Sequence, residues 1–211
     1  MAGVFPKHKG TKQLFTNPIL EKLSRTHIAV PLTIFVVYAT VLLYWSITHT
    51  SLSPGVTVSL FGIGAITFTL VEYLTHRYVF HMGTFTKWRE KFQYTVHGVH
   101  HEYPKDKERL AMPPLLSITI STLLLLLLRL VLGDYTFAFL PGFLVGYAYY
   151  LSIHYIVHVY QPPKNMFRVL WVNHAIHHYK DGEYFGVTSP LWDYVFGTLN
   201  QKGNGSGHHH H

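Results

Sequence analysis

The chain has 211 residues, of which 48% are hydrophobic and only 13% are charged. This composition is typical of a membrane protein rather than a water-soluble domain. The absence of cysteine excludes disulfides, thiolate-bound metals, haem-thiolate chemistry and cysteine nucleophiles. The net charge of +7 could suit nucleic acid, but no nucleic-acid-binding motif accompanies it, and the placement of the basic residues favours another explanation.

The first 27 residues are polar and basic and contain no short apolar core of the kind that a signal peptide has. We expect them to form a cytoplasmic or interfacial segment. Asn17 followed by Pro18 is a typical helix start, because asparagine caps free N–H groups and proline suits the first helical turn. The sequence therefore predicts a short helix at the membrane surface before the first span.

Four apolar stretches follow, each near the roughly 20 residues that a helix needs to cross a bilayer. They run from about 28 to 47, 56 to 74, 115 to 132 and 137 to 157. Of the 17 Lys and Arg residues, only Arg129 lies near the link between spans one and two or the link between spans three and four. The positive-inside rule then places both termini and the long central loop in the cytoplasm.

The predicted fold is all-α, an integral membrane protein with four transmembrane helices and a cytoplasmic helical cap. We interpret residues 1–204 as a single membrane-embedded domain, and residues 205–211 as a linker and histidine tag. The tag histidines are not counted as ligands. Cytoplasm-facing termini fit either a bacterial inner membrane or the endoplasmic reticulum.

Thirteen histidines precede the tag, and ten of them fall into four clusters on the predicted cytoplasmic side. Two clusters have the pattern H-x-x-H-H. Positions i, i+3 and i+4 of a helix share one face, so the three imidazoles of such a cluster can point together. The ten clustered residues are His76, His81, His97, His100, His101, His154, His158, His174, His177 and His178.

His76 and His81 are five residues apart and do not share a face of an ideal helix. We expect the second span to end or turn between them. Around the second cluster, an apolar stripe at helical spacing from Trp88 to Val99 lies opposite the histidines. The stripe predicts a cap helix that docks on the membrane or on the other helices.

Ten imidazoles brought together would repel one another when protonated and would leave ring N–H groups unpaired when buried. Metal ions resolve both problems, because neutral imidazole is a common ligand. One first-row ion takes about four to six ligands, so the sequence predicts two ions with about five histidines each. All-nitrogen ligation suits iron, zinc or copper. Neither Glu-x-x-His nor His-Glu-x-x-His occurs.

Carboxylates near metal-bound histidines commonly fix the imidazole tautomer. Glu72, one turn before His76, and Asp193 are candidates for this role. A carboxylate as close to an apolar span as Glu72 is unfavourable unless it has a function. Tyr150 is a candidate for contact with substrate, although an interfacial aromatic belt would explain most of the tyrosines nearby equally well.

The histidine pattern resembles the fatty acid hydroxylase and sterol desaturase superfamily of membrane di-iron enzymes. Three segments carry the resemblance, at 72–81, 97–114 and 174–198. They are most similar to those of the fatty acid 2-hydroxylases, here of the kind that lacks the cytochrome b5 domain.

The resemblance implies that the ten histidines bind two iron ions, which zinc can replace in purified protein. It implies O2-dependent hydroxylation of a fatty acyl chain at carbon 2, either free or in a ceramide. A separate electron donor is expected, such as cytochrome b5 or a ferredoxin with its reductase. One departure from the family pattern is Leu151 after Tyr150, where members often have Asp, and it bears on the headgroup of the substrate.

Two alternatives stay open at this point. Another lipid oxidase of the superfamily, such as a desaturase or a sterol or carotenoid hydroxylase, could use a similar histidine cage. A non-redox zinc membrane protein would instead hold zinc in cells and would depend on neither oxygen nor an electron donor.

Overall fold

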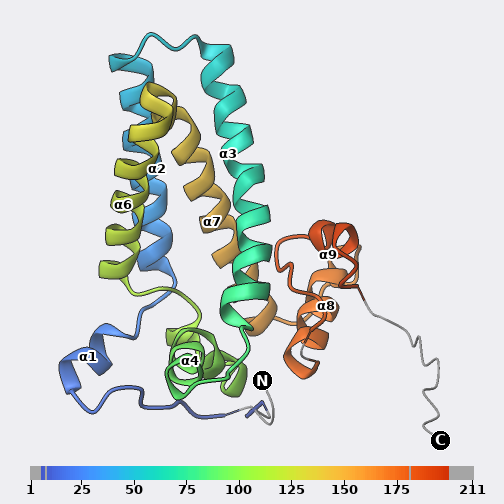
Figure 1. Cartoon of the computed structure of the whole chain (residues 1–211). Helices are drawn as coiled ribbons and strands as arrows, with labels where there is room; N and C mark the ends of the chain where they lie inside the picture. Colours follow the sequence, from blue (N-terminus) through green and yellow to red (C-terminus); the bar gives the residue numbers. More distant parts are fainter. Residues whose placement is uncertain (1–5, 8, 181, 200–211) are drawn as a thin grey trace, which may run out of the picture.

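A computed structural model of the chain describes residues 6–7, 9–180 and 182–199. The proposed linker and tag at 205–211 lie outside the described residues. All regular structure in the described part is helical, as the sequence predicts. Four long helices stand side by side, with short helices at one end of them (Figure 1). The long helices are α2 (Ala29–His49), α3 (Pro54–Thr75), α6 (Pro114–Leu132) and α7 (Thr136–Val159).

Each predicted span corresponds to one long helix, with bounds that differ by at most two residues. Three helical stretches within the described residues are long and apolar enough to cross a membrane, at 29–49, 54–80 and 107–159. The third stretch contains both α6 and α7, which are joined by a 3₁₀ turn at Gly133–Tyr135. These stretches indicate a membrane protein.

Close packing between α3 and α7 fixes the centre of the bundle. A Cβ atom added to Gly142 would lie 1.9 Å from the carbonyl oxygen of Phe61, and one added to Gly64 would lie 2.1 Å from that of Phe139. Real atoms do not approach so closely, so only glycine fits at these two positions. The two glycines therefore let the backbones of α3 and α7 touch.

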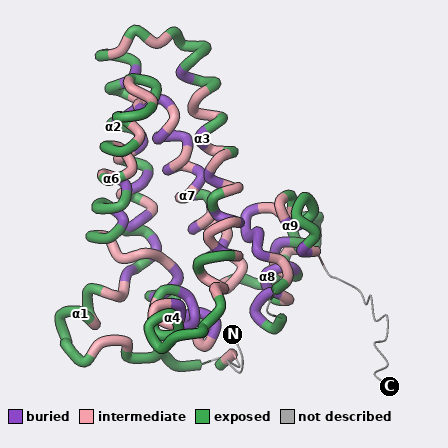
Figure 2. Tube along the Cα trace, in the orientation of Figure 1, coloured by how far each residue is buried: buried purple, intermediate pink, exposed green. Residues whose placement is uncertain are grey.

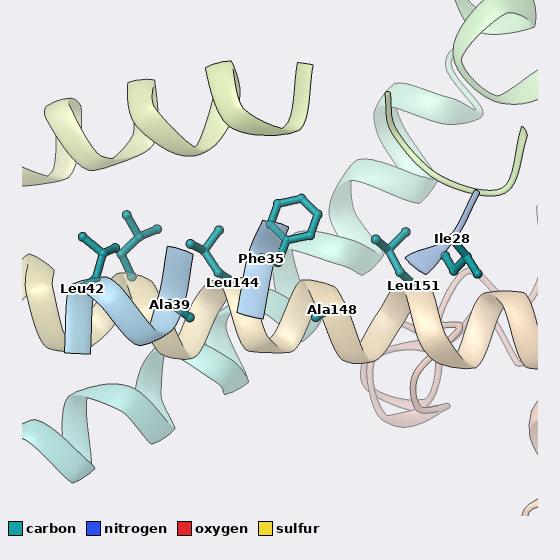
Figure 3. Close-up of a cluster of buried hydrophobic side chains, with 8 residues drawn as sticks. Ile28, Phe35, Ala39, Leu42, Leu144, Ala148 and Leu151 are labelled. Carbon is teal, nitrogen blue, oxygen red and sulfur yellow. The ribbon is translucent and has the colours of Figure 1, made fainter. Parts of the chain in front are cut away.

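A buried apolar core joins α2 to α7 (Figure 3). Phe35 and Ala39 of α2 meet Leu144 of α7 there, and none of the three is more than 2% exposed. Burial follows the faces on which the helices meet, whereas outward faces are exposed (Figure 2). Those outward faces carry large apolar side chains such as Leu130, which is 84% exposed. A lipid environment accounts for such a surface.

The short helices form a cap at the end of the bundle where α3 and α7 finish (Figure 1). The cap contains α1 (Pro18–Leu23), α4 (Lys87–Gln93), α5 (Val99–Glu102), α8 (Arg168–Tyr179) and α9 (Leu191–Val195). The predicted capping residue of α1 is confirmed, because the Asn17 side chain accepts the backbone N–H groups of Ile19 and Leu20 at 2.9 and 3.3 Å.

Several polar contacts hold the N-terminal segment, with α1, against the rest of the cap. The backbone N–H of Lys7 donates to the carbonyl of Glu102 at 2.7 Å. Glu21 forms an ion pair with Arg109 at 2.5 Å, and its other oxygen accepts the backbone N–H groups of residues 14 and 15. The segment therefore runs along the cap instead of standing apart from it.

Candidate metal centre

All ten clustered histidines meet where the bundle joins the cap. Nine of them form two groups, and within each group one ring nitrogen of every residue lies within 4.8 Å of the others. The five-histidine group is His76, His81, His97, His101 and His177, and the four-histidine group is His100, His154, His158 and His174. The tenth residue, His178, has its Nε2 3.1 Å from Nε2 of His174.

A π-helical turn brings His76 and His81 together. The turn covers His76–Phe80 and follows α3 directly. Its wider winding joins residues five apart, and the N–H of His81 donates to the carbonyl of His76 at 3.2 Å. The two ring centroids are consequently 5.2 Å apart. The predicted turn is thus a π turn.

Each H-x-x-H-H cluster contributes to both groups. His97 and His101 belong to the five-histidine group, whereas His100 belongs to the other. His177 and His174 are divided in the same way. Neighbouring residues of a helix point about 100° apart, so one cluster can reach two adjacent centres. The three imidazoles of a cluster therefore do not all converge on one point.

The ring nitrogens face one another at short distances. Nε2 of His97 lies 3.1 Å from Nε2 of His76 and 2.9 Å from Nε2 of His101. In the four-histidine group, the Nε2 atoms of His158 and His174 are 2.6 Å apart. A neutral imidazole has one N–H, so one nitrogen cannot satisfy two such neighbours by donating protons. A cation between the nitrogens would satisfy all of them.

The tautomers of two rings fit metal binding. Nδ1 of His76 lies 2.6 Å from the carbonyl oxygen of Phe185, and Nδ1 of His177 lies 2.9 Å from that of Glu183. A carbonyl only accepts, so Nδ1 carries the proton in both rings. In a neutral ring, Nε2 is then the unprotonated nitrogen and carries a lone pair. This is the form in which imidazole binds iron, zinc or copper.

Burial keeps the imidazoles neutral. It is the main reason that the pKa of His81 falls to about 3, and the neighbouring His177 lowers it further. Burial and, after it, nearby histidines hold the pKa of other cap residues well below the ordinary value. These residues are His97, His100, His101, His174 and His178. Uncharged rings are ready to act as ligands.

Both candidate carboxylates are buried, and both bind the loop at 183–188. Asp193 accepts the backbone N–H groups of Phe185 and Gly186 at 2.7 and 2.8 Å. Glu72 accepts the next two backbone N–H groups at 2.8 and 3.0 Å, and the hydroxyl of Thr188 at 2.6 Å. The carboxylates thus reach the histidines through a loop.

The role of this loop could not be predicted from the sequence. Its contacts with His76 and His177 use backbone carbonyls, which every residue has. Gly186 offers the one local signal, because an added Cβ would lie 2.3 Å from the carbonyl oxygen of Ser189 and 2.7 Å from Oδ2 of Asp193.

Tyr150 lies beside the four-histidine group. Its ring stacks on His154 with centroids 5.5 Å apart, and on Tyr147 at 5.9 Å. The ring of Phe185 lies 5.5 Å from the rings of both His81 and His177, in the five-histidine group. Aromatic rings therefore adjoin both groups of histidines.

Residues 61–198 match the family model described as fatty acid hydroxylase. The chain belongs to the fatty acid hydroxylase family. This confirms the resemblance seen in the histidine pattern. A solved structure similar to this family member is full-length Scs7p, of which only the hydroxylase domain is visible. The two chains are 32% identical in sequence and superpose with a TM-score of 0.83. The match covers 92% of this chain and 75% of the Scs7p chain.

Curated relatives of this hydroxylase family member point the same way. It is 39% identical over 155 residues to the dihydroceramide fatty acyl 2-hydroxylase FAH2 of Arabidopsis thaliana. This match covers 71% of this chain and 65% of the relative. It is 38% identical over 163 residues to the ceramide very long chain fatty acid hydroxylase scs7 of Schizosaccharomyces pombe, covering 73% of this chain and 47% of the relative. The matches thus span about half to two thirds of these relatives.

Proposed function

We propose that this protein hydroxylates a fatty acyl chain at carbon 2, using O2 and external electrons. The observation that carries the proposal is the pair of adjoining, buried histidine groups whose ring nitrogens converge. The relatives are named as hydroxylases of dihydroceramide or ceramide acyl chains. Their names favour a sphingolipid acyl chain over a free fatty acid as the substrate.

The ten histidines would hold two ions between them, and His178 would complete the four-histidine group. Two bound iron ions would supply the oxidising power with which O2 attacks the C–H bond at carbon 2. One oxygen atom enters the C–H bond and the other leaves as water, so each turnover takes two electrons and two protons. A donor protein would provide them, such as cytochrome b5 or a ferredoxin with its reductase.

The protein's own side chains would keep the site dry and the substrate in place. The rings of Phe185 and Tyr150 adjoin the two histidine groups and exclude water from them. Tyr150 would contact the acyl chain from the bundle side, since it stands on α7 next to His154. Leu151 follows it. Its side chain is apolar and buried, and therefore offers no charge to a headgroup.

For the topology, we propose that α6 and α7 each cross the bilayer, which gives four spans within one domain at 1–204. The turns at 50–53 and 133–135 lie at the end of the bundle opposite the cap (Figure 1). Most basic residues belong to the cap and the N-terminal segment, which favours a cytoplasmic cap. The membrane is a bacterial inner membrane or the endoplasmic reticulum.

Metal analysis of tag-cleaved protein from iron-supplemented cells tests the proposal. We expect close to two metal ions per chain, iron among them, and 2-hydroxyacyl lipids in cells that express the protein. Folded protein with one metal ion or none would contradict it. Full zinc occupancy in cells with no dependence on oxygen would favour the non-redox zinc protein. A product that has lost two hydrogens and gained no oxygen would indicate a desaturase.

A further inference from the structure

The loop at 183–188 is held by two carboxylates. Its four consecutive backbone N–H groups from residue 185 to residue 188 all donate to Asp193 or Glu72. Both carboxylate residues are buried: Asp193 is 0% exposed and Glu72 is 7% exposed. Hydrogen bonds to a charged group are among the stronger ones in proteins. The loop backbone is therefore firmly held in one position.

One peptide unit of this loop links Asp193 to a histidine. The N–H of Gly186 donates to Oδ2 of Asp193 at 2.8 Å. The carbonyl of the same peptide unit, which belongs to Phe185, accepts Nδ1–H of His76 at 2.6 Å. Hydrogen bonds in a chain polarise one another, so the carboxylate makes this carbonyl a better acceptor. The series runs from Asp193 through one peptide unit to His76.

The second histidine contact depends on the same residue. The carbonyl of Glu183 accepts Nδ1–H of His177 at 2.9 Å. The N–H of the same peptide unit, at residue 184, donates to the carbonyl of Thr198 at 3.0 Å. The hydroxyl of Thr198 in turn donates to Oδ1 of Asp193 at 2.7 Å. Asp193 thus supports both peptide units that bind histidines.

The support is unequal between the two histidine groups. His76 and His177 both belong to the five-histidine group. In the four-histidine group, Nδ1 of His100 and Nδ1 of His174 have no hydrogen-bond partner among the described residues, and the backbone contact of His154 is with Leu110, outside the loop at 183–188. A histidine whose second nitrogen is fixed holds a metal in a defined orientation and with higher basicity. The loop therefore favours one of the two metal positions.

We propose that Asp193 is a positioning residue for the metal ion of the five-histidine group, and that Glu72 assists it by holding the second half of the same loop. The inference rests on the proposed metal centre. Its consequence is that the two ions are separable: loss of the Asp193 carboxylate weakens the binding of one ion and leaves the other in place.

The space around Gly186 supports this role. A Cβ atom there would displace the carboxylate of Asp193, because the two atoms would be 2.7 Å apart. The Asp193 carboxylate therefore occupies space beside Gly186 that a side chain at this position would need.

The test is retention of metal by purified, tag-cleaved protein during dialysis against a chelator. Asp193→Asn keeps the size of the side chain, but its amide nitrogen would face a backbone N–H in place of an oxygen. Outer partners of metal-binding histidines typically contribute about 10- to 100-fold to affinity. At a chelator concentration at which the wild type holds two ions, we expect Asp193→Asn to hold one.

Double variants identify the remaining ion. Combined with His100→Ala, Asp193→Asn should leave no ion, whereas combined with His177→Ala it should leave one. Glu21→Gln is the matched control, because Glu21 also accepts two consecutive backbone N–H groups but lies in the N-terminal segment. It should retain both ions.

Asp193→Asn that keeps both ions, or loses both together, would overturn the inference. A wild type that never holds two ions would instead overturn the proposed metal centre, so the two failures are distinguishable. If Asp193→Asn does not fold, Thr198→Val carries the same test. It removes one hydrogen bond to Asp193 and leaves the carboxylate, so a smaller weakening of the same ion is expected.

Discussion

A buried imidazole binds a metal ion only through an unprotonated ring nitrogen. His177 donates Nδ1–H to the carbonyl of Glu183, so its Nε2 is the unprotonated nitrogen and carries the lone pair that a metal ion binds. Burial adds to the effect, because a charged ring is unfavourable away from water. Single residues of the cage are therefore expected to matter strongly and separately.

His100→Ala and His177→Ala each remove one ligand, from the four- and five-histidine groups respectively. Loss of an outer partner alone reduces activity by about 10- to 100-fold, so loss of a ligand should reduce it by about 100-fold or more. Each variant should also hold fewer than two ions. Product formation and metal content per chain are measured together.

His49→Ala is the control for these variants. His49 ends α2 and stacks on Trp45, at the opposite end of the bundle from the cap. It should keep both ions and full activity. Full activity with two ions in either cage variant would contradict the assignment of the ligands.

At this scale, much of the site could be predicted from the sequence. Helical spacing relates eight of the ten histidines, because residues three or four apart share a face. His76 and His81 are five residues apart, and a π turn brings them together. Helical spacing could not divide the ten between two ions, because His100 and His101 are neighbours that point in different directions. It also could not identify the carbonyls of Glu183 and Phe185, since a backbone acceptor leaves no trace in a sequence.

Among the helices, the contact between α3 and α7 carries the site, since one helix leads into His76 and the other contains His154. Gly142→Ala and Gly64→Ala each place a methyl group against a backbone carbonyl of the facing helix. Overpacking of this kind typically destabilises by about 1–3 kcal/mol. Both variants should unfold at lower temperature in detergent, as followed by circular dichroism.

Gly62→Ala is the matched control, because Gly62 lies on α3 with Gly64. An added Cβ there meets nothing within 4 Å. Because alanine favours a helix over glycine by up to about 1 kcal/mol, this variant should be neutral or slightly more stable. Equal destabilisation by all three substitutions would contradict the close contact between α3 and α7.

The helices also show where a regular pattern misleads. The apolar stripe predicted from Trp88 to Val99 assumed one continuous helix. A π turn at Tyr94–Gly98 interrupts it, and such a turn changes the face on which later residues lie. Val99 is buried at 4% exposure, whereas Trp88 is 69% exposed and Val96 is 42% exposed. The stripe therefore divides: Val99 packs inside the protein, whereas docking of Trp88 and Val96 on the membrane stays a prediction.

For the whole molecule, the proposed topology can be tested directly because the chain has no cysteine. Single cysteines at Ser51, Asp134 and Lys164 would report the two turns and the cap. With four spans and a cytoplasmic cap, a membrane-impermeant thiol reagent should label Ser51→Cys and Asp134→Cys from the non-cytoplasmic side. Lys164→Cys should be labelled only after that reagent gains access to the cytoplasm.

Labelling of Asp134→Cys and Lys164→Cys from the same side would contradict separate crossings by α6 and α7. A cap accessible from the non-cytoplasmic side would contradict the orientation. The sequence predicts this arrangement from the distribution of 17 basic residues. Helix lengths alone cannot decide which side of the membrane the cap faces.

The most direct measurement of the central claim is isotope labelling with purified, iron-loaded protein. The protein is given a dihydroceramide, a chemical or protein electron donor and ¹⁸O2, and the lipid is analysed by mass spectrometry. The account predicts a 2-hydroxyacyl product that carries one ¹⁸O atom, and about 100-fold less of it from His177→Ala. Folded wild-type protein with two bound ions that yields no such product, or places the oxygen at another carbon, would contradict it.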